Sequence, residues 1–236
     1  MNFNRYFFSI SSVWIFAFFS LSASAESAIA NPLKGSTLLL SMRGLKLPEI
    51  TTRDHLNEAE DSNIQKAYSK YFAKKNHPKL WFNENFLVKI HKDMFCDIWE
   101  WAGIYYIGSQ RNIGVVFYEI SEHMQNLCKE VQEWLAGKTD LDDLQQSARI
   151  LHRIMQIHPF TNGNGRYARF VSNLYLYSLN GSRPYWPDKA LLDDGIERQL
   201  LLQALKSGDQ GDFALLEKLI VEYGGRHALF INPSIF

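Results

Sequence analysis

Residues 158–169, HPFTNGNGRYAR, decide which fold and which chemistry this sequence predicts. A histidine precedes a turn rich in glycine and asparagine, and two arginines follow the turn. Gly163 and Gly165 can adopt backbone angles that other residues avoid, so successive N–H groups can turn inward around an anion. A helix that starts directly after such a turn adds its free N–H groups and the positive end of its dipole. This stretch, called the motif below, therefore predicts a phosphate-binding loop.

The charged side chains of the motif indicate what the loop does with a phosphate. Arg166 and Arg169 lie three residues apart, on adjoining parts of one helix face, and guanidinium groups bind phosphate oxygens at two points. His158 lies at the edge of the loop, and an imidazole with a pKa near neutrality can take a proton from an incoming hydroxyl. We also expect Asn164 to brace the loop through its side-chain amide. The motif thus combines a base with a phosphate site.

The composition predicts one well-packed domain. The chain has 236 residues, 46% of them hydrophobic and 14% aromatic, which is ample for one core and short for two domains. Lysine plus arginine and aspartate plus glutamate both number 25, so the net charge is zero, and neither nucleic acid nor an anionic membrane is expected as a partner. Cys96 and Cys128 fit neither a metal spacing nor a disulfide framework, and we expect two small buried thiols.

Residues 1–25 have the layout of a secretory signal peptide. One positive charge, Arg5, precedes an uncharged apolar run, and Ala23 and Ala25 stand where a signal peptidase reads small residues. This pattern predicts cleavage after Ala25 and an exported or periplasmic protein. Two alternatives stay open: an uncleaved anchor, for which the apolar run is slightly short, and a cytoplasmic protein whose translation starts at Met42.

Hydrophobic periodicity predicts a mainly helical single domain over 51–225, with an extended lead-in at 26–50 and a short tail at 226–236. Apolar residues recur every three or four positions, as on one face of a helix, and caps and glycines mark the helix ends. The expected helices start at Thr52 and Asn83, cover Ile120–Leu135 and Leu141–Met155, follow Arg166 as far as Asn180, and cover Asp193–Lys206 and Asp212–Tyr223.

The period changes to two between Ile104 and Phe117. In GIYYIGSQRNIGVVF, residues 103–117, apolar side chains alternate on both sides of a polar turn at Ser109–Asn112. Alternation around a short polar turn is typical of a β-hairpin. The helical domain is therefore expected to carry one short hairpin, with Trp99 and Trp101 packed beneath it.

The motif resembles the signature of Fic-domain proteins, His-x-Phe-x-(Asp/Glu)-Gly-Asn-Gly-Arg-x-x-Arg, and differs from it at Asn162. The similarity extends to GLKLPEITTRDHLNEAEDSNIQKA, MFCDIWEWAGIYYIGSQRNIGV and RIMQIHPFTNGNGRYAR, which look like the Fic subfamily called mobile mystery protein B. It covers roughly residues 35–223. The resemblance implies a single Fic-type helical domain in which the short β-hairpin is the flap, the segment that docks the target.

Fic enzymes typically transfer AMP from ATP to a Ser, Thr or Tyr hydroxyl of a target protein, with Mg²⁺. The resemblance implies that His158 is the general base. It assigns the phosphates of the nucleotide to Gly163, Asn164 and Gly165, a phosphate oxygen to Arg166, and the terminal phosphate to Arg169. The flap would pair its main chain with the target by β-augmentation. The flap residues that match are Gln110, Arg111, Asn112, Ile113 and Gly114.

Asn162 stands where most Fic proteins carry Asp or Glu as a Mg²⁺ ligand. Mg²⁺ prefers charged oxygen ligands, and Asn offers a neutral carbonyl oxygen, so the protein should bind the metal more weakly. ATP can still carry Mg²⁺ into the site on its own phosphates. We therefore expect weakened activity, not its loss, and the same Asn looks usual for the mobile mystery subfamily.

Many Fic proteins are inhibited by a glutamate, in a (Ser/Thr)-x-x-x-Glu-(Gly/Asn) motif, that pairs with the second arginine of the signature. LNEAED, residues 56–61, is the nearest match and makes Glu60 the candidate partner of Arg169. Leu56 and Asp61 both depart from the inhibitory pattern. The alternative is that Glu60 is an exposed or capping residue of the first helix.

Three classes of function stay open. The first is a protein adenylyltransferase. The second is a related transferase with another donor, such as a Doc-type phosphotransferase, whose motif usually carries Lys where Gly165 stands. The third is a nucleotide-binding or interaction protein that has lost catalysis, and Asn162 favours it. A cytoplasmic form would also, by analogy with the subfamily, act beside a helix-turn-helix regulator.

Overall fold

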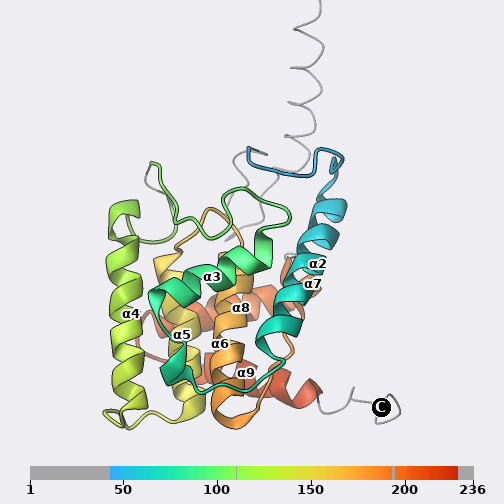
Figure 1. Ribbon diagram of the computed structural model, residues 1–236. Helices are drawn as coiled ribbons and strands as arrows, with labels where there is room; N and C mark the ends of the chain where they lie inside the picture. The colour runs from blue at the N-terminus through green and yellow to red at the C-terminus, as the bar shows by residue number, and fades with distance from the viewer. Residues whose placement is uncertain (1–42, 110, 193–194, 228–236) are drawn as a thin grey trace, which may run out of the picture.

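The computed structural model describes residues 43–109, 111–192 and 195–227, which form a mainly helical fold (Figure 1). The helices are α2 Arg53–Tyr71, α3 Glu84–Phe95, α4 Ile120–Leu135, α5 Asp143–Ile157, α6 Asn164–Asn180, α7 Asp188–Leu192, α8 Ile196–Gly208 and α9 Ala214–His227. Two short 3-10 helices, η1 Pro78–Leu80 and η2 Phe117–Glu119, precede α3 and α4. The expected signal peptide, most of the lead-in at 26–50, Gln110 and most of the tail at 226–236 lie outside the described residues.

The helix starts and stops follow local sequence signals. The Thr52 side chain accepts a hydrogen bond from the His55 N–H at the start of α2, and the Asn83 side chain accepts one from the Phe86 N–H at the start of α3. Gly181 ends α6 with a left-handed φ of 88°, which a residue without Cβ adopts at little cost. The mainly helical fold that the sequence predicts is confirmed, because these signals act within one or two turns.

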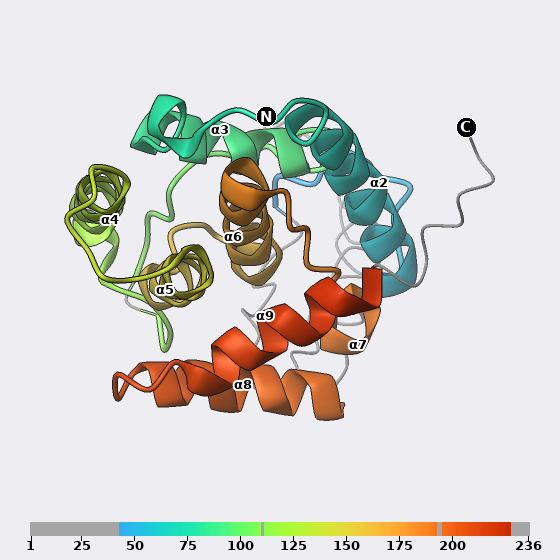
Figure 2. The ribbon, with the colours of Figure 1, turned by 90° about the horizontal axis from the view of Figure 1, so that it is seen from below.

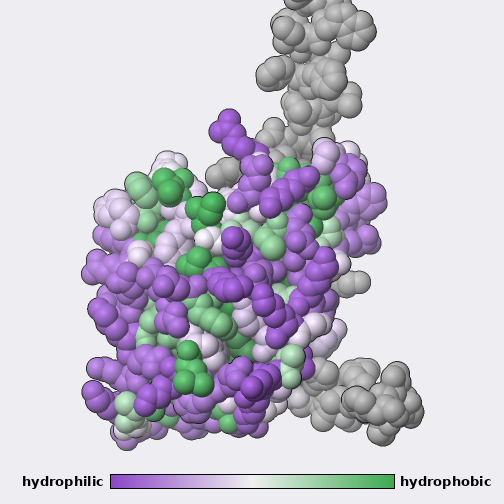
Figure 3. All heavy atoms as spheres, in the orientation of Figure 1, coloured by the Kyte–Doolittle hydropathy of each residue, from purple (hydrophilic) through white to green (hydrophobic). Residues whose placement is uncertain are grey.

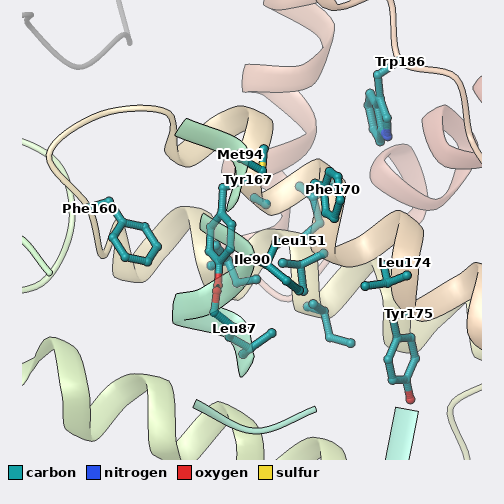
Figure 4. Close-up of a cluster of buried hydrophobic side chains, with 14 of the residues drawn as sticks. Leu87, Ile90, Met94, Leu151, Phe160, Tyr167, Phe170, Leu174, Tyr175 and Trp186 are labelled. Atoms are coloured by element: carbon teal, nitrogen blue, oxygen red, sulfur yellow. The ribbon is translucent and has the colours of Figure 1, made fainter. Parts of the chain in front are cut away.

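Helix α6 lies at the centre of the fold, between α2, α3 and α5, while α8 and α9 lie together on the side away from α3 (Figure 2). Figure 4 shows Tyr167 of α6 next to Leu87 and Ile90 of α3, and Phe170 of α6 and Leu151 of α5 belong to the same buried cluster. The Tyr167 hydroxyl also donates to the Leu87 carbonyl at 3.1 Å. Replacing a buried aromatic side chain with alanine costs about 3–5 kcal/mol, so such packing fixes the start of α6, where the motif lies.

The surface is mostly hydrophilic on the face that Figure 3 shows, with apolar side chains in small separate groups. Cys128 is buried, as expected, while Cys96 is partly exposed, and both are free thiols. Within the described residues, no helix is both long and apolar enough to cross a membrane.

The segment expected to form a β-hairpin, 104–117, takes a different form. Its described residues contain no pair of strands; Tyr105 instead makes an isolated antiparallel bridge with Phe160 of the motif. The Tyr106 N–H donates to the Pro159 carbonyl at 2.9 Å, and the Val115 N–H donates to the Ile157 carbonyl at 3.2 Å. Backbone groups that a hairpin would pair with each other are thus bound to the motif and to the end of α5, which is the physical reason for the correction.

Candidate active site

Two residues of the motif, His158 and Gly163, have left-handed backbone conformations. His158 ends α5 with φ 53°, and it is the only non-glycine residue with a positive φ in the described part of the chain. Gly163 has φ 76° and precedes α6. A Cβ at Gly163 would lie 2.5 Å from the Phe95 ring, so glycine is required both by the backbone angle and by the space. Gly163 also has no side chain with which to bind the first N–H groups of α6, which leaves them to an anion.

Asn164 braces the motif, as predicted. Its Oδ1 accepts a hydrogen bond from the Phe160 N–H at 2.9 Å, and its Nδ2 donates to the Phe160 carbonyl at 2.8 Å. The side chain is buried, and both ends of its amide are used in these bonds. What Asn164 can offer a phosphate is therefore its backbone N–H, the first of α6, and not its side chain.

Asn162 is held from two directions. Its Oδ1 accepts a hydrogen bond from the Gly163 N–H at 2.8 Å, and its backbone carbonyl lies 3.2 Å from Nε2 of His91. The Gly103 N–H donates to Nδ1 of His91 at 3.0 Å, so Nε2 carries the proton and donates to Asn162. Burial lowers the pKa of His91 to about 3, which keeps the ring neutral and preserves this arrangement.

His91 is a supporting residue that the sequence did not reveal. Its ring stacks on Phe160 with 3.5 Å between centroids and 10° between planes. The sequence indicated only a histidine without metal-ligand spacing, on a helix. The one available signal in the sequence was the position of His91 beside the apolar residues of α3. The bond to Asn162 could not be predicted, because the two residues are 71 positions apart.

His158 is buried, and its backbone is bound on both sides. Its N–H donates to the Ile154 carbonyl at 2.9 Å, and its carbonyl accepts from Nη2 of Arg111 at 2.6 Å. Burial, together with the positive charge of Arg111, lowers the pKa of His158 to about 4. The imidazole is therefore neutral at pH 7, the form in which it can accept a proton.

Glu60 pairs with the first arginine of the motif and not with the second, which corrects the expected pairing with Arg169. Its Oε2 lies 2.7 Å from Nη2 of Arg166, and its Oε1 accepts a hydrogen bond from the Trp99 indole at 2.6 Å. Glu60 is buried, so it is neither an exposed nor a capping residue of α2. Trp99 stacks on Trp101 with 4.8 Å between centroids, and its indole binds the glutamate.

Arg169 pairs with Asp188, at the start of α7, through Nε at 3.1 Å and through Nη2. Arg169 lies nearly one turn beyond Arg166 on α6, and the directions of the two side chains differ by about 60°, so Arg166 reaches Glu60 of α2 while Arg169 reaches the start of α7. Asp188 gave no signal in the sequence, because it lies at the start of the short helix α7, 19 residues after Arg169. Both motif arginines are thus held by carboxylates.

A cavity of about 560 Å³ lies beside the two arginines, between α2, α6 and the segment at 183–190. Arg166, Arg169 and Asp188 line it together with aromatic side chains that include Tyr68 and Trp186. Its volume falls in the range of small-molecule sites, which runs from about 300 to 1,000 Å³. Charged groups and aromatic walls in one cavity suit a ligand with both anionic and ring parts.

The candidate flap residues divide between the motif and the surface. Arg111 donates to the carbonyls of His158 and Phe160, and Gly114 lies against His158. Asn112 is exposed and Ile113 is half-buried. Gln110 lies outside the described residues. The structure therefore ties Arg111 and Gly114 to the motif.

In the described ranges there is no group of three or more His, Cys, Asp or Glu side chains that could hold a metal ion. Mg²⁺ in phosphate-transfer sites often takes one or two protein ligands and completes its coordination with phosphates and water. Asn162 Oδ1 has one lone pair in use and one left for such a role.

Comparisons with known proteins give the family. Residues 81–176 match the model of the Fic/DOC family. "Protein adenylyltransferase fic-1" of Caenorhabditis elegans is 33% identical over 57 residues, which are 23% of this chain and 11% of that protein. "Probable protein adenylyltransferase aq_aa38" of Aquifex aeolicus is 29% identical over 96 residues, which are 40% of this chain and 27% of that protein. The matches thus span less than a third of these relatives.

Solved structures show the same fold. The BepC protein of Bartonella tribocorum, with bound AMPPNP, has a TM-score of 0.55 at 18% identity and matches over 74% of this chain and 88% of its own. Fic-1 of C. elegans, residues 134–508, has a TM-score of 0.56 at 17% identity and matches over 89% of this chain and 61% of its own. The family model covers the motif and most of α6, the fold agrees with that of Fic proteins, and residues 81–176 accordingly form a domain of the Fic/DOC family.

Proposed function

We propose that this chain is a protein adenylyltransferase, which transfers AMP from ATP to the hydroxyl of a Ser, Thr or Tyr side chain of a target protein. One observation carries the proposal: a neutral, buried His158 ends α5 directly before the loop from which α6 starts, and α6 carries Arg166 and Arg169. A base, an open helix N-terminus and two guanidinium groups are what this reaction requires. The two relatives named protein adenylyltransferase support the same reaction class.

In the proposed step, the target hydroxyl oxygen attacks the α-phosphorus of ATP. The bond between that phosphorus and the oxygen that bridges to the β-phosphorus breaks, and pyrophosphate leaves. His158 takes the proton of the attacking hydroxyl, for which its low pKa keeps it in the neutral form. The N–H groups at Asn164 and Gly165 would bind the phosphates at the N-terminus of α6, and the Gly163 N–H would join them on leaving Asn162 Oδ1.

The nucleotide would enter the cavity beside Arg166 and Arg169. Each guanidinium would then exchange a carboxylate, Glu60 or Asp188, for a phosphate oxygen. We include Glu60 in the proposal as an inhibitory residue, acting on Arg166. Its second bond, to the Trp99 indole, supports this role because it fixes the carboxylate in place while the nucleotide is absent.

Mg²⁺ forms part of the proposal as an ion bound mainly through ATP. Asn162 would be its one protein ligand from the motif, with Oδ1, and would bind it weakly since the amide is uncharged. When bound, the ion would neutralise charge on the phosphates; His158 and the arginines supply the remaining chemistry.

A second candidate, a nucleotide-binding or interaction protein with weak or lost catalysis, is favoured by Asn162 and by the pairing of both arginines. A Doc-type phosphotransferase is disfavoured by Gly165. The proposal also includes membership of the mobile mystery protein B subfamily, a helix-turn-helix regulator as partner, and export after cleavage at Ala25 as opposed to a cytoplasmic form. These three parts rest on the sequence.

ATP labelled at either the α- or the γ-phosphate separates these functions. The protein is incubated with each label and Mg²⁺, and protein-bound label is measured after denaturation. Label retained from the α-phosphate alone supports AMP transfer. Label retained from the γ-phosphate alone would identify a phosphotransferase, and nucleotide binding without retained label would favour the binding protein.

A further inference from the structure

Arg111 lies against the motif and is fixed by three contacts. Its Nη1 donates to the Phe160 carbonyl at 2.8 Å, and its Nη2 donates to the His158 carbonyl at 2.6 Å. The guanidinium also lies over the Tyr106 ring, 3.8 Å from its centroid. One side chain from the flap thus binds the backbone of the candidate base and that of the loop after it.

Gly114, on the other side of the flap turn, contacts the same residue. It has φ 94°, and a Cβ at this position would lie 2.7 Å from Cβ of His158 and 2.9 Å from the Ile157 carbonyl. The next residue, Val115, donates its N–H to that carbonyl. The flap backbone therefore packs directly on the end of α5 and leaves no room for a side chain between itself and His158.

His158 needs such support because of its backbone conformation. Its φ of 53° is unfavourable for a residue with a Cβ, and such a conformation persists where surrounding contacts enforce it. The direction of the imidazole depends on this φ, since the Cα–Cβ bond turns with the backbone. Contacts to the His158 carbonyl and to its Cβ are the ones that set this direction.

We propose that Arg111 is a positioning residue that, together with the Gly114 contact, holds His158 in its left-handed conformation and aims the imidazole at the incoming hydroxyl. The proposal concerns the base of the proposed adenylyl transfer and rests on that function for its catalytic meaning. The geometric part, the control of His158 by the flap, can be measured without turnover.

The charged and polar groups around His158 define an electrostatic part of the test. Arg111 acts from the flap and lowers the pKa of His158, while the Met155 carbonyl of α5 accepts a hydrogen bond from the ring and raises it. On α6, Arg166 and Arg169 are paired with Glu60 and Asp188. Loss of the Arg111 charge should thus raise the pKa of His158, whereas a lysine should keep that pKa but lose the two-point bond.

The first experiment compares Arg111→Gln and Arg111→Lys with the wild-type full chain. Histidine ring resonances are followed by NMR from pH 3 to 8, with His158 assigned from His158→Gln, and transfer rates and AMPPNP affinity are measured beside them. We expect Arg111→Gln to raise the pKa of His158 and to lower kcat more than tenfold, with AMPPNP affinity within twofold of wild type. Arg111→Lys should lower kcat with the pKa unchanged.

Arg149→Gln is the matched control. Arg149 also binds a backbone carbonyl, that of Gln145, and lies over an aromatic ring, Phe213, at 4.4 Å. The Arg149→Gln variant should show the His158 resonances and the kcat of the wild type. A kcat and a His158 spectrum that do not change in Arg111→Gln would overturn the proposal.

A second pair of variants tests the contact at Gly114. Gly114→Ala places a methyl group at His158, whereas Gly137→Ala has a similar φ of 79° and meets nothing within 4 Å. We expect a shift of the His158 resonances and a fall in kcat in Gly114→Ala alone. Equal behaviour of the two variants would overturn the proposal, and this comparison decides even if Arg111→Gln does not fold. Wild-type protein that binds AMPPNP but transfers nothing would count against the proposed function only, since the resonances still report the positioning.

Discussion

Glu60 and Arg166 form an ion pair that joins α2 to the first turn of α6, with 2.7 Å between Oε2 and Nη2. Their side chains are 3% and 11% exposed, so water screens the pair little. The Trp99 indole binds the second carboxylate oxygen, and the Arg166 guanidinium lies over the Phe95 ring. The Glu60 carboxylate thus binds the Arg166 guanidinium, which would bind a phosphate of the nucleotide in the proposed reaction.

Glu60→Gly is expected to increase self-modification, because it releases Arg166 for the nucleotide. Thermal stability should fall as well, since removing one partner of a buried pair costs about 3–5 kcal/mol. The measurement is incorporation of α-labelled ATP beside the melting temperature. Glu58→Gly is the matched control, because it places a glycine at an exposed position of the same helix. Self-modification that does not exceed that of Glu58→Gly would leave Glu60 a structural residue.

His158→Ala is expected to reduce transfer by about a hundredfold to ten-thousandfold, the usual contribution of a general base. AMPPNP binding should persist, since the N-terminus of α6 and both arginines remain. Transfer is measured with α-labelled ATP and binding by calorimetry. His55→Ala, at an exposed position, serves as the control. Full activity of His158→Ala would refute the assignment of the base.

Asn162→Asp is expected to lower the Mg²⁺ concentration needed for half-maximal activity. One carboxylate oxygen can keep the bond to the Gly163 N–H, and the other can bind the ion with a formal charge. A Mg²⁺ titration of transfer measures the effect. Asn112→Asp adds the same charge at an exposed flap position and should not move the midpoint. An unchanged midpoint in Asn162→Asp would mean that this side chain does not face the metal.

Asp188→Asn is expected to tighten AMPPNP binding, because Arg169 no longer has to leave a carboxylate. The Asp188 side chain is 44% exposed, and a pair of this kind contributes up to about 1 kcal/mol, which corresponds to roughly a fivefold gain in affinity. Calorimetric titration of the variant and of Asp140→Asn, an exposed control, measures it. Equal affinities would show that Arg169 does not contact the nucleotide.

Stability is expected to fall as the pH drops below about 6.5. His91 and His158 have folded-state pKa values lowered to about 3 and about 4, against 6.5 for an ordinary histidine. Below pH 6.5 the unfolded chain therefore binds protons at these two histidines that the folded chain does not bind. Their contribution is complete above pH 6.5 and is lost as the pH falls toward 4 and 3. Each such group changes the free energy of unfolding by up to about 1.4 kcal/mol per pH unit.

His91→Gln tests this dependence, because a glutamine can still donate to Asn162 and accept from Gly103 while it does not titrate. The free energy of unfolding in urea, measured between pH 7.5 and 4.5, should fall less steeply than in wild type. His55→Gln, at an exposed position, should keep the wild-type slope. Identical slopes for the two variants would contradict the role of buried His91.

Features that depend on near neighbours in the chain could be predicted. Thr52 and Asn83 cap their helices through bonds to N–H groups three residues away, and Asn164 braces Phe160 four residues before it. The hairpin was the exception. Alternation at 104–117 was correctly found, but its backbone pairs with 157–160, which lie more than forty positions later. Periodicity reports which faces of a segment are apolar and not which backbone it meets.

The sequence by itself determined most of the helices and the glycine turn of the motif, and it singled out His158, Arg166 and Arg169 as the candidate base and phosphate-binding residues, because each of these patterns depends on residues a few positions apart. Only the tertiary structure decided that Glu60 reaches Arg166, that Asp188 takes Arg169, and that His91 and Arg111 hold the motif. These pairings depend on how α6 is rotated against α2 and α3, which the packing of side chains such as Tyr167 and Phe170 sets. Arg169 lies nearly one turn beyond Arg166 on α6 and therefore meets a different neighbour, and no local pattern records which neighbour lies at each level of the helix.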